Sequence, residues 1–238
     1  MKNPLPKFDA PPVVETVLSA QFARLERFSN AHAGWFWKNY LAKDWNKVNS
    51  APRLEDQFER FGEEIRWGTP PGLRILPGSG PERLQILRED SERMIQVQDS
   101  RFIYNWTKQK EQYPSYEQVL RGFEKEFTAF EKFSKDAGFA LLDLNQWEVT
   151  YVNHIEKGPL WQTLNDWTKI FPQYAFPTQG LLECMPEDFH GEWKEIIGDK
   201  RGRLYVSFNR GRVGTEKGSE IIRVQLTARG PIRSEADF

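Results

Sequence analysis

RMIQVQDSRFIYNWTK (residues 93–108) and WEVTYVNHI (residues 147–155) both alternate apolar residues with polar ones. This period of two is typical of a β-strand that buries one face. In the first stretch, Gln96 and Gln98 fall on the side opposite Ile95 and Val97. Strands that face only a core and bulk water rarely need so many amides, a carboxylate and a histidine. The two stretches therefore predict a sheet, and a binding surface on it.

Further strands and helices are predicted on either side of these stretches. Alternation predicts strands over 13–25 and 83–88, and a hairpin over 202–209 and 220–229. Three- and four-residue spacing predicts a helix over 30–48, and Gly158-Pro159 begins another that Pro172 ends. The clearest helix runs from a capping box at Ser115 to Gly138 and carries a stripe of phenylalanines. Proline and glycine between residues 54 and 81 indicate an irregular connection.

The order of these elements begins again after Gly138. We therefore expect an α+β fold of two similar β-α-β-β-α lobes, an internal pseudo-duplication of mainly antiparallel sheets with helices packed on one face. The expected domains are residues 1–140 and residues 141–238. The second lobe is expected to lack its closing helix, because the chain reaches Phe238 soon after Pro231.

Composition limits the class of protein. Nine Trp, seven Tyr and 17 Phe in 238 residues supply enough large apolar side chains to exclude a disordered chain. A net charge of −1 gives the whole chain no long-range attraction to nucleic acid or to an anionic membrane. No apolar run is long enough to span a membrane, and the first residues lack the apolar core of a signal peptide. The expectation is a cytoplasmic protein with no membrane partner.

Polar residues of the two opening stretches are the candidate binding site. If corresponding strands of the two lobes lie together, their polar faces meet around one concavity with two aromatic walls. The candidate ligand-binding residues are Gln96, Gln98, Asn105, Trp106, Glu148, Tyr151, Asn153 and His154. The alternative is that these are the wetter faces of half-buried strands, with Asn105 and Asn153 bonding loop backbone.

Catalytic and metal-binding patterns are sparse. The three histidines are far apart in sequence, and the run CMPEDFH (184–190) is more typical of a solvated turn than of a metal site. No Walker loop, dinucleotide-binding glycine pattern or nucleophile elbow occurs. Glu148 and His154 lie about 20 Å apart along one extended strand and cannot touch unless the strand bends. We therefore expect no catalytic residues, no metal and no cofactor, and the pattern favours a protein that is not an enzyme over one that is.

A local basic segment offers a second function. Residues 200–233 carry nine cations against two carboxylates, in a chain that is nearly neutral overall. The candidate nucleic-acid-binding residues are Arg201, Arg203, Arg210, Arg212 and Arg223. Arginines on an edge hairpin also prevent sheets from pairing with one another, so this signal has a structural reading as well.

Four motifs resemble a known family. They are PPVVETV (11–17), IQVQDSRFIYNW (95–106), Tyr113-Pro114, and EVTYVNHI (148–155). In this order they resemble a sporadically distributed bacterial protein family of about 250 residues and unknown function. The chain departs from that pattern at Thr107, where a basic residue is expected. The patchy distribution implied by the resemblance is typical of accessory or phage-defence loci.

These patterns favour a non-catalytic binding or regulatory module that recognises a protein or a small ligand. The expected partner is another protein or a second copy of the chain, as in a homo-oligomer. Nucleic-acid binding through the hairpin at 200–233 is the alternative, and a hydrolase or nuclease built from Glu148, His154 and distant acids is the second alternative.

Overall fold

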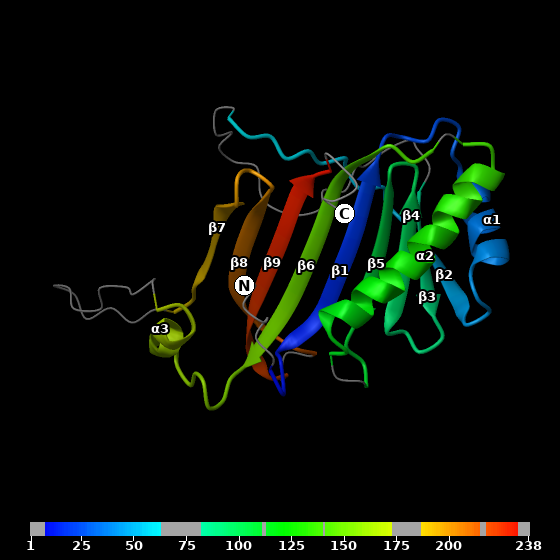
Figure 1. The fold of residues 1–238 in the computed structure, drawn as a ribbon. Coiled ribbons are helices and arrows are strands. Elements are labelled where there is room, and N and C mark those ends of the chain that lie inside the picture. The colour runs from blue at the N-terminus through cyan, green and yellow to red at the C-terminus, as the bar shows by residue number, and fades with distance from the viewer. Residues whose placement is uncertain are drawn as a thin grey trace.

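One antiparallel sheet contains every strand of the described residues. The structure is a computed structural model, and it describes residues 8–62, 82–110, 113–139, 141–172, 187–214 and 218–232. The strands are β1 (Val13–Phe22), β2 (Trp45–Ala51), β3 (Arg83–Arg88), β4 (Arg93–Gln98), β5 (Arg101–Thr107), β6 (Leu144–Glu156), β7 (His190–Ile197), β8 (Gly202–Arg212) and β9 (Glu220–Pro231). They form a nine-stranded sheet in the order β2-β3-β4-β5-β1-β6-β9-β8-β7 (Figure 1).

The prediction of two β-α-β-β-α lobes with helices packed on one face is wrong. β1 pairs with β5 along one edge and with β6 along the other, so strands from both halves of the chain form a continuous ladder. Leu18, for example, lies opposite Tyr104 on one side and Val149 on the other. β1 is hydrogen-bonded to a neighbouring strand along both of its edges, so it is an interior strand of one sheet. It therefore cannot be the boundary strand of a separate lobe. The antiparallel pairing that was predicted does occur.

Two of the three predicted helices are shorter than expected, since the helix predicted over 30–48 ends early and the one predicted over 158–172 is reduced to a 3₁₀ turn and one short helix. The described residues form α1 (Asn30–Tyr40), α2 (Tyr116–Asp136), a single 3₁₀ turn (Leu164–Asp166) and α3 (Trp167–Ile170). The helix predicted over 30–48 ends at Tyr40, because Leu41 is already extended and the rest of that pattern becomes β2. The strand β7 was not predicted, since its mostly exposed, charged residues lack clear alternation.

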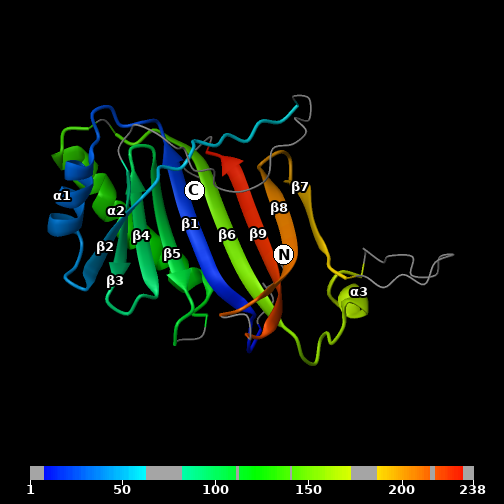
Figure 2. The ribbon, with the colours of Figure 1, turned by 180° about the vertical axis from the view of Figure 1, so that it is seen from behind.

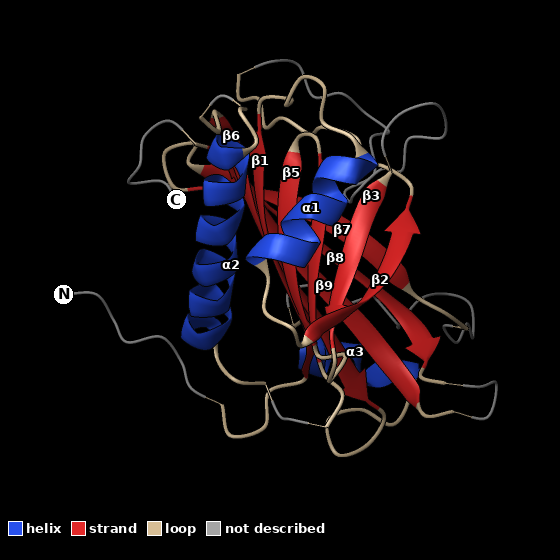
Figure 3. Ribbon diagram, turned by 90° about the vertical axis from the view of Figure 1, so that its right-hand side faces the viewer, coloured by secondary structure: helices blue, strands red, loops and turns tan. Residues whose placement is uncertain are grey.

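The long helix α2 is confirmed and builds the main core. The side chain of Ser115 accepts a hydrogen bond from the Gln118 backbone N–H at 3.4 Å, as the capping pattern predicts. Phe127 and Phe130 of its apolar stripe contact Phe102 of β5 at ring-centroid distances of 5.4 Å. α1 and α2 lie on the same side of the sheet (Figure 3), which we call the helix face.

The helix face is covered differently over the second half of the sheet. Seven buried side chains form a small cluster around α3 and the adjoining ends of β8 and β9: Trp161, Trp167, Phe171, Phe189, Phe208, Ile222 and Val224. Farther along, Trp147 of β6 lies against two glycines. A Cβ on Gly202 would lie 3.0 Å from the Trp147 ring, and one on Gly230 would lie 2.7 Å from it. The two glycines therefore make the space that this indole occupies.

Candidate functional site

The other side of the sheet, which we call the polar face, carries the amides and charges. Alternation along each strand places these residues opposite the apolar residues of the helix face. Neighbouring strands continue the pattern in register, so that Glu148 of β6 lies opposite Ser19 of β1 and Arg229 of β9. The polar face includes Glu15, Ser19, Gln21, Gln85, Gln96, Gln98, Arg101, Asn105, Gln146, Glu148, Thr150, His154, Arg203, Tyr205, Arg223, Gln225, Thr227 and Arg229.

A segment of the chain itself lies across this face. Residues 53–61, which we call the strap, follow β2 and run across the strands toward β8 and β9 (Figure 2). Hydrogen bonds attach the strap to β4, β1, β6, β9 and β8, in the order of these strands in the sheet. The strap therefore lies across the strands rather than along them.

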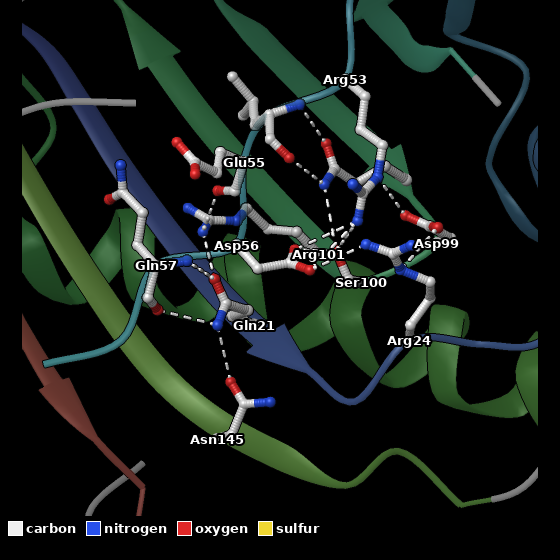
Figure 4. A network of polar contacts seen from close by, with 12 residues as sticks. Gln21, Arg24, Arg53, Glu55, Asp56, Gln57, Asp99, Ser100, Arg101 and Asn145 are labelled. Carbon is white, nitrogen blue, oxygen red and sulfur yellow. Dashed lines mark hydrogen bonds and ion pairs between the residues drawn. The ribbon is translucent and has the colours of Figure 1, made fainter. Parts of the chain in front are cut away.

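Three glutamines fix the backbone of the strap. Gln98 accepts from the Leu54 N–H and donates to the Leu54 carbonyl oxygen, both at 3.0 Å. Gln21 makes the same two bonds to Gln57, both at 2.9 Å (Figure 4). Gln146 accepts from the Glu59 N–H at 3.0 Å. At Gln98 and Gln21 the glutamine side chain bonds to both the N–H and the C=O of one residue, as a neighbouring strand does in a β-sheet. Such bonds recognise the backbone of the strap and do not depend on its side chains.

The first half of the strap is anchored by one apolar contact and one carboxylate. The Leu54 side chain is 2% exposed and packs with Val17 and Ile103, which are apolar residues on the polar face. Asp56 forms ion pairs with Arg53 at 3.2 Å and Arg24 at 3.3 Å (Figure 4). This end is therefore held by burial and by charge as well as by the glutamines.

The second half of the strap is anchored by Glu59. Its carboxylate accepts hydrogen bonds from Arg203, from Arg229 at 3.4 Å and from the Tyr205 hydroxyl at 2.5 Å. Burial raises the pKa of Tyr205, and the hydrogen bond to Glu59 raises it further. Arg229 also donates to Glu148 at 2.6 Å. Glu148 is therefore part of a buried charge network and not a free acid.

Arg101 is a buried cation beneath the strap. It is 2% exposed and donates to the Gln21 side chain and to the Glu55 carbonyl oxygen, the latter at 3.4 Å. Among the described residues its Nε has no hydrogen-bond partner, and no carboxylate lies within ion-pair distance of it. Burial lowers the pKa of this guanidinium.

A row of amides lies one step along the strands from the strap. Gln85 donates to Gln96 at 3.1 Å, Gln96 donates to Asn105 at 2.8 Å, and Asn105 donates to Glu15 at 2.8 Å. Of the predicted ligand-binding residues, the structure thus brings Gln96 and Asn105 into one row, and Gln98 and Glu148 under the strap.

The remaining predicted ligand-binding residues lie elsewhere. Trp106 is fully buried in the core of the helix face, and the Tyr151 hydroxyl lies 3.1 Å from that of Tyr113. Burial raises the pKa of Tyr151. Asn153 donates to a backbone carbonyl of β9 at 3.4 Å. The two aromatic rings therefore cannot form walls around the amides of the polar face.

His154 lies at the far end of β6 from the strap. It borders a pocket of about 530 Å³ together with Lys108, Tyr113, Glu156 and apolar residues of the segment before β1. Burial lowers the pKa of His154, and the charge of a nearby arginine lowers it further. Six residues of extended strand separate it from Glu148, which places them about 20 Å apart. The structure therefore gives no acid–base pair of these two.

Most arginines of the basic hairpin are engaged within the chain. Arg203 pairs with Glu59, while Arg210 and Arg212 share the carboxylate of Glu220 at 3.0 and 3.2 Å. Arg223 donates to its neighbour Gln225 at 2.8 Å, and Arg201 belongs to the turn before β8. Three of the five candidate arginines, Arg203, Arg210 and Arg212, are thus paired with carboxylates, and nucleic-acid binding by the hairpin stays a prediction.

Sequence reasoning missed three residues that hold the strap in place, Gln21, Gln146 and Glu59. Gln21 lies among apolar residues of β1, at an alternate position that faces the same side of the strand as Ser19. The same kind of alternation singled out Gln98. Gln146 lies just before the alternating stretch of residues 147–155. Glu59 belongs to an irregular segment with no period, so nothing in its surroundings marks it.

Comparison with known proteins adds no relative. No protein-family model matches the chain, and a search of curated proteins found no match. Within the described ranges, no three His, Cys, Asp or Glu side chains converge as metal ligands, and Cys184 lies outside those ranges. No helix in the described part of the chain is long and apolar enough to cross a membrane. Membership of the sporadically distributed bacterial family stays a prediction.

Proposed function

We propose that the chain is a non-catalytic binding module whose polar face recognises an extended segment of a partner protein. One observation carries the proposal. Gln98, Gln21 and Gln146, from three separate strands, hold the backbone of an extended segment by hydrogen bonds at 2.9 to 3.0 Å. Peptide recognition domains gain affinity from the same kind of main-chain hydrogen bonding.

The chemistry of the face suits binding better than catalysis. Glu148 is neutralised by Arg229, Glu15 accepts a hydrogen bond from Asn105, and the amides bond to one another. A catalytic base must have a free lone pair and lie within hydrogen-bond reach of the proton that it takes from the substrate. Amides neither take up nor release protons near neutral pH, but they supply both donors and acceptors for a peptide backbone.

Selection from a library of random linear peptides tests the proposal. The wild-type chain should enrich peptides whose affinity falls about tenfold or more when one amide of the polar face is changed, a loss of about 1.4 kcal/mol. Gln98→Met and Asn105→Ala sample the face under the strap and the amide row. Lys132→Ala, on the exposed side of α2, is the matched control. Peptides that bind these variants as well as wild type would contradict the proposal, and so would turnover of a peptide or nucleotide that is lost in His154→Ala.

A further inference from the structure

The strap is held in the manner of a bound ligand. Its contacts fall into two kinds, since glutamines hold the backbone at Leu54, Gln57 and Glu59 while the side chains enter separate positions. Leu54 fills an apolar position between Val17 and Ile103. This division, with backbone contacts for affinity and side-chain positions for selectivity, is typical of peptide recognition.

Two carboxylates complete the pattern of the strap. Asp56 accepts from the Ser100 hydroxyl and pairs with Arg24 at 3.3 Å. Glu59 receives Arg203, Arg229 and the Tyr205 hydroxyl. Together with Leu54, they give the spacing Leu-x-Asp-x-x-Glu.

The sheet beneath the strap is electropositive by itself. It presents three arginines, Arg101, Arg203 and Arg229, and the one sheet carboxylate in described contact with them is Glu148, which pairs with Arg229. From the strap, Glu59 pairs with Arg203 and Arg229, while Asp56 pairs with Arg24 at the neighbouring end of β1. A buried arginine without a counter-charge is costly, so whatever occupies this position must bring negative charge with it.

We propose that this site takes an acidic extended peptide of a partner protein with a hydrophobic-x-Asp-x-x-Glu pattern, and that the strap is its tethered occupant. The proposal rests on the function proposed above and names the ligand of the same face. Because a short tether gives the strap an effective concentration in the millimolar range, a partner segment binds only by displacing it. The apparent affinity of the partner is therefore lowered by the fraction of chains whose strap is bound.

A synthetic peptide of residues 51–62 tests the proposal on the full chain. The double variant Leu54→Ser, Glu59→Gln weakens the strap and leaves the glutamines and arginines of the sheet in place. The peptide should bind this variant at least tenfold more tightly than it binds wild type, and should raise its melting temperature in proportion to the logarithm of peptide concentration. The matched control is the same peptide with Asp56→Asn and Glu59→Gln, which should bind about tenfold more weakly or not at all.

The outcomes separate this proposal from the broader one. A folded double variant that ignores the peptide, or that binds the control peptide equally well, overturns the tethered-ligand proposal. If library-selected peptides still bind the polar face in that case, the broader function stands and its ligand has another pattern. Should the double variant be unfolded alone, the single variant Leu54→Ser replaces it, and the same two peptides are compared by circular dichroism and calorimetry.

Discussion

Gln98→Met removes the fastening of the strap without changing the charge or much of the volume of the side chain. The Gln98 amide is fully buried and makes three hydrogen bonds, at 3.0 and 3.0 Å to the Leu54 backbone and at 3.2 Å to the Ser100 hydroxyl. At about 1 kcal/mol for each bond, the loss is about 3 kcal/mol. The Leu54 N–H and carbonyl oxygen lose their partners in this variant. The cost is larger if these groups stay buried and smaller if water reaches them. We expect the free energy of unfolding to fall by about 2–4 kcal/mol.

Urea denaturation followed by tryptophan fluorescence measures this loss, and Gln85→Met is the matched control. Gln85 is a half-buried amide on the same face, and the one side-chain hydrogen bond described for it goes to Gln96 at 3.1 Å. Its replacement should cost under about 1 kcal/mol. Amide hydrogen exchange should also accelerate at Leu54 in Gln98→Met while the exchange of β1 is unchanged. Equal costs for the two variants, or unchanged exchange at Leu54, would refute the view that Gln98 holds the strap.

Three further predictions concern packing and pH. Gly122→Ala in α2 should destabilise the fold by about 1–3 kcal/mol in thermal or urea unfolding, because the new Cβ would overlap the Tyr104 side chain. Gly34→Ala in α1 should stabilise the fold by about 0.5–1 kcal/mol, because its new Cβ has no atom within 4 Å and alanine favours the helix. Hydrogen bonds from a lysine and an arginine lower the pKa of Glu220 to about 2. The ionised carboxylate therefore stabilises the fold above the usual pKa of 4.5, and this stabilisation is lost as the pH falls toward 2. Glu220→Gln should lower the melting temperature near neutral pH and leave it nearly unchanged in strong acid. Burial lowers the pKa of His154 below 6.5, so protonation of this side chain destabilises the fold as the pH falls below that value. His154→Gln should therefore flatten the pH dependence of the melting temperature just below pH 6.5. An NMR titration that gives His154 a pKa above 6.5 would contradict this prediction.

Local patterns in the sequence predicted several elements but not the way they join. The apolar stripe of α2 and the alternation of β4 to β6 depend on neighbours within a few residues, so they are legible from the sequence. The pairing of β1 with β6 joins residues more than a hundred positions apart, and no local pattern specifies it. The repeated order of elements favoured two closed lobes, where the chain instead forms one ladder.

The candidate site was predictable in the same uneven way. Parity alone placed Gln96 and Gln98 on a polar face, and the same argument applied to adjacent Asn105 and Trp106 would have put their side chains on opposite faces. The strap could not be found, since residues 54–61 have neither period nor turn signals that mark an ordered segment. Its order comes from the glutamines and arginines of distant strands.

The side-chain amide resonances of Gln21, Gln98 and Gln146 report most directly on whether the polar face binds an extended peptide. In the double variant Leu54→Ser, Glu59→Gln these signals should move away from their wild-type positions, because the three side chains no longer exchange hydrogen bonds with the backbone of the strap. Addition of the peptide of residues 51–62 should return them toward those positions, and the control peptide lacking both carboxylates should not. Shifts confined to other surfaces, or no shifts at peptide concentrations of about 1 mM, would contradict the account.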